Sequence, residues 1–170
     1  VPTAQYAAYS YIEPFMKFVA KMPDNMVTIN LMILGCAGLL GSAIFARTYE
    51  KHVKVFLTLS ITSIAVSHLL LYPATVNEFA MIALFIFWGV CMTCFGMASQ
   101  ADLMAATTVS AAPVAMSIYS GIFNFGIGSG TWVGGMICDH IDIAYIGYGA
   151  GILTILGTIF SAWLASHLHK

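Results

Sequence analysis

A long apolar stretch rich in glycine, residues 112–138, constrains the fold of this chain more than any other segment. It exceeds the roughly 20 residues that a helix needs to cross a bilayer. Gly126, Gly130 and Gly134 recur at every fourth position, so on a helix they form one smooth stripe that another backbone can approach closely. This glycine stripe predicts a membrane helix that packs tightly against a second helix.

The opposite side of the same helix is polar. Asn124 lies about 200° around the helix from Gly126, and Ser117 and Ser120 share its side. Because an amide is unfavourable in lipid at mid-depth, Asn124 is expected to face protein or a water-filled cavity. One face of this helix is therefore predicted to pack and the other to line a polar space.

The composition excludes an ordinary soluble domain. Apolar residues make up 60% of the 170 positions and charged residues only 8%, against about 25% charged in soluble proteins. The formal net charge of −1 provides no basic surface for nucleic acid. The chain opens without a methionine or a basic leader, so it is not expected to carry a signal peptide and is interpreted as part of a longer protein.

Six apolar segments are each long enough to span a bilayer, and short breaks with proline or charged residues separate them. The predicted spans are residues 4–22, 25–47, 53–72, 78–100, 114–138 and 143–167. They use almost the whole length, so a single all-α bundle of six transmembrane helices is expected. Segments two and five are the glycine-rich ones, which favours a three-plus-three inverted repeat.

The basic residues predict the orientation of this bundle. With six spans both termini face the same side of the membrane. That side carries Arg47, Lys51, Lys54 and Lys170, and the other side carries Lys17 and Lys21. By the positive-inside rule, both termini are expected to be cytoplasmic.

The first segment combines a kink with a polar stripe. Pro14 cannot donate a hydrogen bond to the carbonyl of Ser10, so the helix should kink there. An ionisable residue within a span is a candidate functional group, and Glu13 is predicted to line a cavity. An i, i+4 ion pair with Lys17 is the alternative, and the two roles are compatible. The polar residues that share this side at helical spacing are Tyr6, Tyr9, Ser10, Glu13 and Lys17.

For the other candidate residues, the sequence indicates structural roles. His68 is expected to be an interfacial or packing residue, with a proton site as the alternative. Trp88 belongs to a stripe that is more typical of a helix core than of a ligand platform. The Cys91-x-x-Cys94 spacing lies within a buried apolar run and does not indicate redox chemistry. No hydrolase or metal-binding motif is present, so neither an enzyme nor a metal or cofactor site is predicted.

Two runs carry a family resemblance. V-A-M-S-I-Y-S-G-I-F-N-F-G-I-G-S-G at 114–130 and A-Y-S-Y-I-E-P-F at 8–15 resemble the eleventh and seventh helices of sugar-efflux transporters in the major facilitator superfamily. The resemblance covers the whole chain as helices seven to twelve, which form the C-terminal half of that fold. It implies that the first, second, fourth and fifth spans border a central cavity and that the third and sixth lie outside.

The resemblance also implies a function. A proton-driven antiporter of the bacterial inner membrane would export sugars or similar small polar metabolites by alternating access. Glu13 would be the proton-coupling residue. The glycine stripe would contact the N-terminal six-helix half, and without that partner it would face lipid. The expected substrate-binding residues are Tyr6, Tyr9, Glu13, Trp88, Ser120 and Asn124.

Two other interpretations remain open from the sequence. The chain could be a self-contained six-helix protein in which two copies form a carrier or channel. It could also be a membrane scaffold without transport activity, whose glycine face docks a partner protein. The lipid bilayer is the common partner in all three interpretations.

Overall fold

The computed structural model describes residues 1–168, except for the side chains at positions 54, 161, 162 and 164–168. Two basic residues of the orientation argument, Lys170 and the side chain of Lys54, lie outside the described residues. Every regular element in the described part is helical. The elements are α1 (Pro2–Tyr9), α2 (Ile12–Pro14), the π-helical turn η1 (Phe15–Val19), α3 (Asp24–Leu69), η2 (Pro73–Val76), α4 (Glu78–Ala105), α5 (Ala112–His140), η3 (Ile143–Tyr145) and α6 (Ile146–Leu168).

The kink predicted in the first segment is confirmed. α1 ends at Tyr9, and a short break separates it from α2, which contains Pro14. Because proline has no backbone N–H, the carbonyl of Ser10 has no helical partner at that position. The segment then widens into η1 and ends at Lys21, whose φ of 54° turns the chain before α3.

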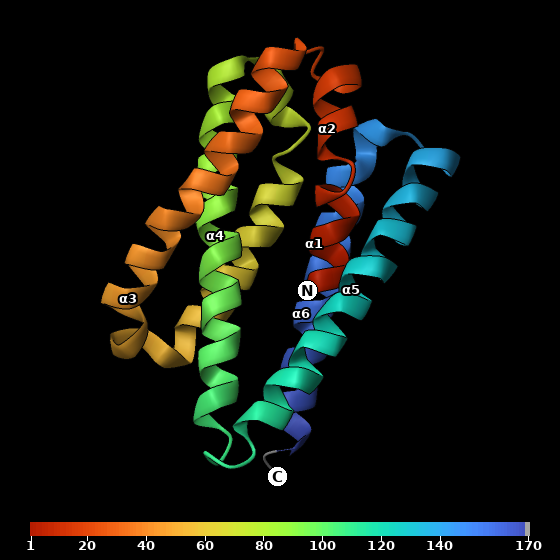
Figure 1. Ribbon diagram of the computed structural model, residues 1–170. Helices are drawn as coiled ribbons and strands as arrows, with labels where there is room; N and C mark the ends of the chain where they lie inside the picture. The colour runs from red at the N-terminus through yellow and green to blue at the C-terminus, as the bar shows by residue number, and fades with distance from the viewer. Residues whose placement is uncertain (169–170) are drawn as a thin grey trace.

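α3 folds back on itself. Its backbone leaves helical geometry at His52, where φ is −134° and ψ is 27°. The bend divides α3 into two apolar arms, Asp24–Val53 and Val55–Leu69. Figure 1 shows the first arm (orange) running toward one end of the molecule and the second arm (yellow) returning beside α4. The predicted break at residues 48–52 therefore appears as a sharp bend at its last residue.

The glycine stripe lies against α1. Gly126, Gly130 and Gly134 are all buried. A Cβ added at Gly130 would lie 2.4 Å from the carbonyl oxygen of Thr3, and one at Gly134 would lie 2.4 Å from that of Ala7. The close packing that the stripe predicts is thus present within the chain. The expectation that the stripe would face lipid without another half is wrong, because α1 covers it.

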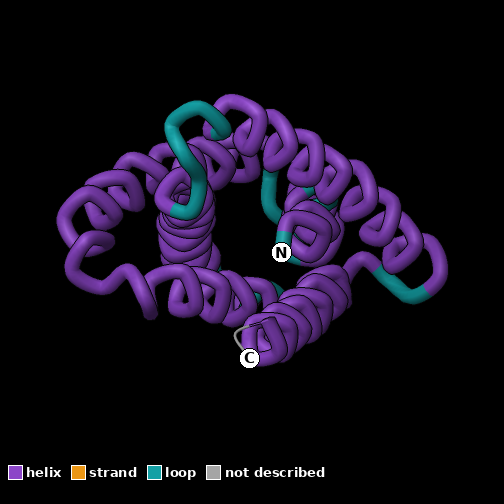
Figure 2. The backbone as a smooth tube through the Cα atoms, turned by 90° about the horizontal axis from the view of Figure 1, so that it is seen from below, coloured by secondary structure: helices purple, strands orange, loops and turns teal. Residues whose placement is uncertain are grey.

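Two further helix pairs pack through glycine. A Cβ at Gly41 would lie 2.8 Å from the carbonyl oxygen of Val90, which joins the first arm of α3 to α4. A Cβ at Gly147 would lie 2.5 Å from the carbonyl oxygen of His68, which joins α6 to the second arm of α3. Seen end-on, the helices form a flattened ring with the N-terminus on its inner side (Figure 2).

The outer surface is apolar. Among the described residues, three helices are long and apolar enough to cross a membrane: Asp24–Val53, Glu78–Ala105 and Ile143–Phe160. Large hydrophobic side chains such as Leu39, Phe125 and Trp132 are exposed. α5 has the length of a span, but glycine, serine and threonine lower its hydropathy. This surface is suited to lipid contact and not to water.

Candidate functional site

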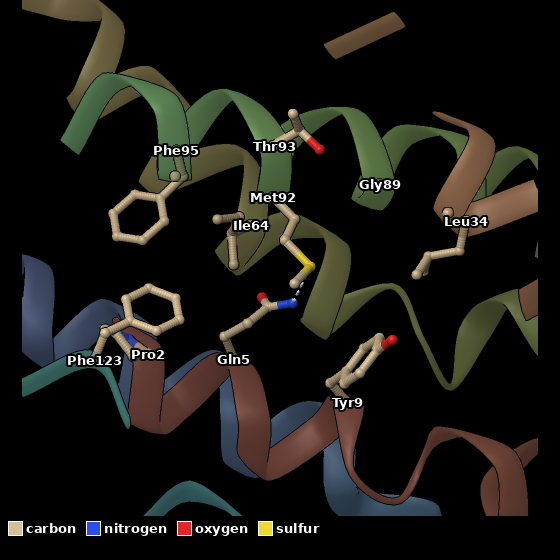
Figure 3. Close-up of a pocket in the computed structure, with 12 residues that line it drawn as sticks. Pro2, Gln5, Tyr9, Leu34, Ile64, Gly89, Met92, Thr93, Phe95 and Phe123 are labelled. Carbon is tan, nitrogen blue, oxygen red and sulfur yellow. Dashed lines mark hydrogen bonds between the residues drawn. The ribbon is translucent and has the colours of Figure 1, made fainter. Parts of the chain in front are cut away.

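Four helices meet around a central cavity of about 290 Å³. Its residues are uncharged, and apolar side chains predominate. Figure 3 shows the side chains of α1 facing those of α4 across this space. Its lining consists of Pro2, Gln5 and Tyr9 from α1, Leu34, Gly35 and Ile64 from α3, Gly89, Met92, Thr93, Phe95 and Gly96 from α4, and Phe123 from α5. The second arm of α3 thus reaches the cavity through Ile64, although the third span was expected to lie outside.

The amide of Gln5 is held in a fixed orientation at the cavity wall. Trp88 Nε1–H donates to Gln5 Oε1 over 3.1 Å, and Gln5 Nε2 donates to Met92 Sδ over 3.2 Å. Both Gln5 and Trp88 are buried, with 4% and 1% of their surfaces exposed. An amide nitrogen carries two protons, so one N–H of Gln5 remains for a ligand. Tyr9 lines the same cavity and adds a phenol group to it.

His68 lies behind this wall. Its ring is 1% exposed and packs edge-on against Trp88, with ring centroids 5.4 Å apart. Its Nδ1 lies 3.3 Å from Oγ1 of Thr154 on α6. His68 is therefore a buried packing residue in this structure and does not reach the protein surface.

Some of the predicted substrate residues gather at the central cavity. Tyr9 lines it, and Trp88 contacts it through Gln5. Tyr6 is half-buried beside the cavity, with its ring 5.6 Å from that of Tyr9 and 6.2 Å from that of Phe123.

Ser120 and Asn124 lie in a second hollow of about 210 Å³. Asn124 Nδ2 donates to the backbone oxygen of Ser120 over 2.9 Å, and Asn124 is an exposed residue that lines this hollow. Gly96 and Phe123 belong to both hollows, so the two spaces are neighbours along α4 and α5. The polar side of α5 therefore lines a continuation of the central cavity.

Glu13 lies apart from these hollows. Its carboxylate is 56% exposed and forms an ion pair with Lys17 at 2.9 Å. Lys17 also contacts Asp24 at 3.1 Å, so one ammonium group bridges two carboxylates. This rim ion pair borders a shallow hollow between the first segment and α3. The alternative role of Glu13, pairing with Lys17, is the one present here.

Several residues of the site went unpredicted. Gln5 is the clearest case, because the sequence contains a signal that could have identified it. This amide lies in the first span, four residues before Tyr9, and therefore on the same side of the helix. Met92 and Thr93 resemble ordinary apolar-helix residues, and their roles depend on which side of α4 faces α1. Among the described residues, no group of three His, Cys, Asp or Glu side chains could hold a metal ion.

The long apolar helices, the lipid-suited surface and the cavity between helices define a multi-pass membrane protein. The family model described as Major Facilitator Superfamily matches residues 3–169, and the chain belongs to that superfamily. Its members are secondary transporters and not enzymes, so this chain is part of the machinery that moves small substrates across a lipid bilayer.

Proposed function

We propose that the chain is the C-terminal half of a proton-driven exporter of sugars or similar small polar metabolites. The observation that carries this proposal is the central cavity, where Trp88 and Met92 fix the amide of Gln5 beside Tyr9. An uncharged lining favours a neutral substrate, because a buried charge without a partner is costly. Oriented hydrogen-bonding groups between aromatic rings suit a hydroxyl-bearing ring.

The way in which the helices pair supports a three-plus-three inverted repeat. Numbered as six rods, the first (α1) packs on the fifth (α5), and the second (first arm of α3) packs on the fourth (α4). The third rod (second arm of α3) packs on the sixth (α6). If rods one, two and three exchange places with rods four, five and six, the contact between rods one and five becomes the contact between rods four and two. The contact between rods three and six is unchanged. An internal repeat has this property.

In the proposed site, the substrate accepts a hydrogen bond from Gln5 and exchanges one with Tyr9. Phe95 and Phe123 offer aromatic rings, whereas Trp88 is too deeply buried to stack on a ligand and acts by positioning Gln5. Tyr6, Ser120 and Asn124 extend the polar surface toward the second hollow. The N-terminal six-helix half would close the site from the other side, and rocking of the two bundles would alternate access.

Glu13 is proposed as a proton-coupling residue at the rim. Its exposed carboxylate can exchange a proton directly with water, and protonation would break the rim ion pair with Lys17. The proposed location is the bacterial inner membrane, with the bend of α3 and the α4–α5 connection at the cytoplasmic side. Arg47 and Lys51 lie near that bend, as the positive-inside rule requires.

The test is transport by the complete protein in proteoliposomes. Labelled monosaccharides and disaccharides are offered under an imposed proton gradient. We expect at least one sugar to move against its gradient, and a protonophore to stop it. Gln5→Leu should abolish this transport, whereas Thr62→Val, on the exposed face of α3, should not. Sugar transport that a protonophore leaves unchanged, or the absence of transport for every sugar, would contradict the proposal.

A further inference from the structure

The ring of His68 has a buried nitrogen without a partner. Thr154 Oγ1–H donates to the carbonyl oxygen of Ala150 over 2.9 Å, which uses the only proton of that hydroxyl. At its 3.3 Å contact with His68, Thr154 must therefore accept, so the proton of the neutral ring lies on Nδ1. The other nitrogen, Nε2, then carries a lone pair. Among the described residues nothing donates to it.

This lone pair needs an explanation. Leaving a buried acceptor unsatisfied is destabilising, and a leucine or phenylalanine would fill the same position without that cost. The basic nitrogen also lies one side chain away from the cavity, because Trp88 contacts both His68 and Gln5. A basic group retained at such a place is suited to take up a proton.

No neighbouring charge stabilises a cationic ring in this conformation. Within the described residues His68 forms no ion pair, and the elements packed around it contribute no carboxylate in contact with it. Burying an isolated cation is far more costly than burying a neutral ring, so the ring is neutral here. The titratable groups on this part of α1, α3, α4 and α6 are Tyr9, Tyr72, Cys91 and Tyr148, and none of them is a carboxylate.

We propose that His68 is a proton-binding site whose occupation opens the contact between α3 and α4 and keeps the contact between α3 and α6. A hydronium ion transfers its proton to Nε2 and leaves as water, and the ring becomes an imidazolium that still donates from Nδ1 to Thr154. The structure described here is the deprotonated, closed state. Because the imidazolium must be hydrated, protonation favours the conformation in which water reaches the ring.

Proton binding is thereby linked to the substrate site. Trp88 lies between His68 and Gln5, so opening this contact removes the group that orients the Gln5 amide. Proton and substrate therefore favour different states and weaken each other's binding, as linkage requires. This inference rests on the proposed proton-driven transport, and it adds a buried proton site to the exposed one proposed at Glu13.

Fluorescence of Trp88 tests the proposal directly. In the closed state Trp88 is 1% exposed and packs against the ring of His68. Opening of the α3–α4 contact brings water to this indole, which shifts its emission to longer wavelength. The complete protein is prepared in lipid nanodiscs with Trp88 as its sole tryptophan. We expect the emission maximum to move to longer wavelength as the pH is lowered from about 8 to about 4, a range that includes the ordinary titration of histidine. Added substrate should move this change to a higher proton concentration.

Three variants give the assay its controls. His68→Asn keeps a donor for Thr154 but has no basic nitrogen, so the pH response should disappear. His140→Asn, on the exposed end of α5, should leave the response unchanged. Thr154→Val removes the acceptor of a charge-assisted hydrogen bond, so the emission change should require a roughly tenfold higher proton concentration.

Wild-type emission that stays constant over this range while the protein remains folded would overturn the inference, whether or not the variants fold. An unchanged response in His68→Asn would overturn it as well. Both results leave the proposed export intact if sugar transport still follows the proton gradient. Conversely, loss of the pH response in His68→Asn supports the proton site even if transport does not depend on the proton gradient. Transport that does not depend on the gradient contradicts the proposed function alone.

Discussion

At the residue scale, the site depends on the hydrogen bond between Trp88 and Gln5. Trp88→Phe keeps an aromatic ring but removes the donor, which leaves Gln5 Oε1 buried without its partner. We expect weaker substrate binding and a loss of stability of about 1–3 kcal/mol. Binding to the purified protein and its thermal unfolding measure the two effects. Substrate affinity equal to that of the wild type would show that the orientation of Gln5 does not matter.

Glu13 provides a second residue-scale prediction. Glu13→Gln keeps the shape of the side chain but removes its ionisable proton. Because its carboxylate is largely exposed, we expect little change in folding, whereas export should lose its dependence on the proton gradient. Asp24→Asn is the matched control, since it removes the other partner of Lys17 without altering the first segment. Equal proton dependence in both variants and in the wild type would exclude a coupling role for Glu13.

The sequence pointed to only part of this site. Tyr9 was expected on a polar stripe and Trp88 on a stripe typical of a helix core; Tyr9 lines the cavity, and Trp88 contacts it through Gln5. Gln5 did not stand out, because its role depends on a tryptophan 83 residues away in the chain. Spacing along one helix shows which residues share a face, and it does not show which helix covers that face.

At the scale of the helices, the glycine stripe illustrates the same limit. Its spacing correctly predicts a face for close packing, but its partner turns out to be α1 and not a second bundle. The kink at Pro14 and the bend near residue 52 were predictable because local chemistry causes them: a missing N–H in one case and a charged break in the other.

Gly130→Leu tests this packing. Its side chain would collide with the carbonyl oxygen of Thr3, 2.4 Å from the Cβ position, so α1 and α5 must separate. We expect a loss of stability of about 1–3 kcal/mol and disturbed transport. Gly128→Leu is the control, because open space surrounds its Cβ position. Thermal unfolding in detergent compares the two variants, and equal stability would show that the stripe is not a tight interface.

At the scale of the whole molecule, the composition and two motifs were enough to predict an all-helical membrane protein of the major facilitator superfamily. The substrate is not encoded in the same direct way, because the cavity is uncharged and is lined by residues from four helices. A charged substrate would require a complementary charge that a sequence can reveal, whereas a neutral one leaves only hydrogen-bonding groups.

The most direct test of the central claim is substrate protection of the cavity wall. Thr93→Cys is introduced into the complete protein after Cys36, Cys91, Cys94 and Cys138 have been replaced by alanine. Thr93 lines the cavity, and Ser110→Cys in the exposed connection between α4 and α5 is the control. Alkylation by a maleimide is then measured with and without the transported sugar. The account predicts that the sugar slows labelling at position 93 and leaves labelling at position 110 unaffected. Equal labelling at position 93 with and without a saturating sugar concentration would contradict it.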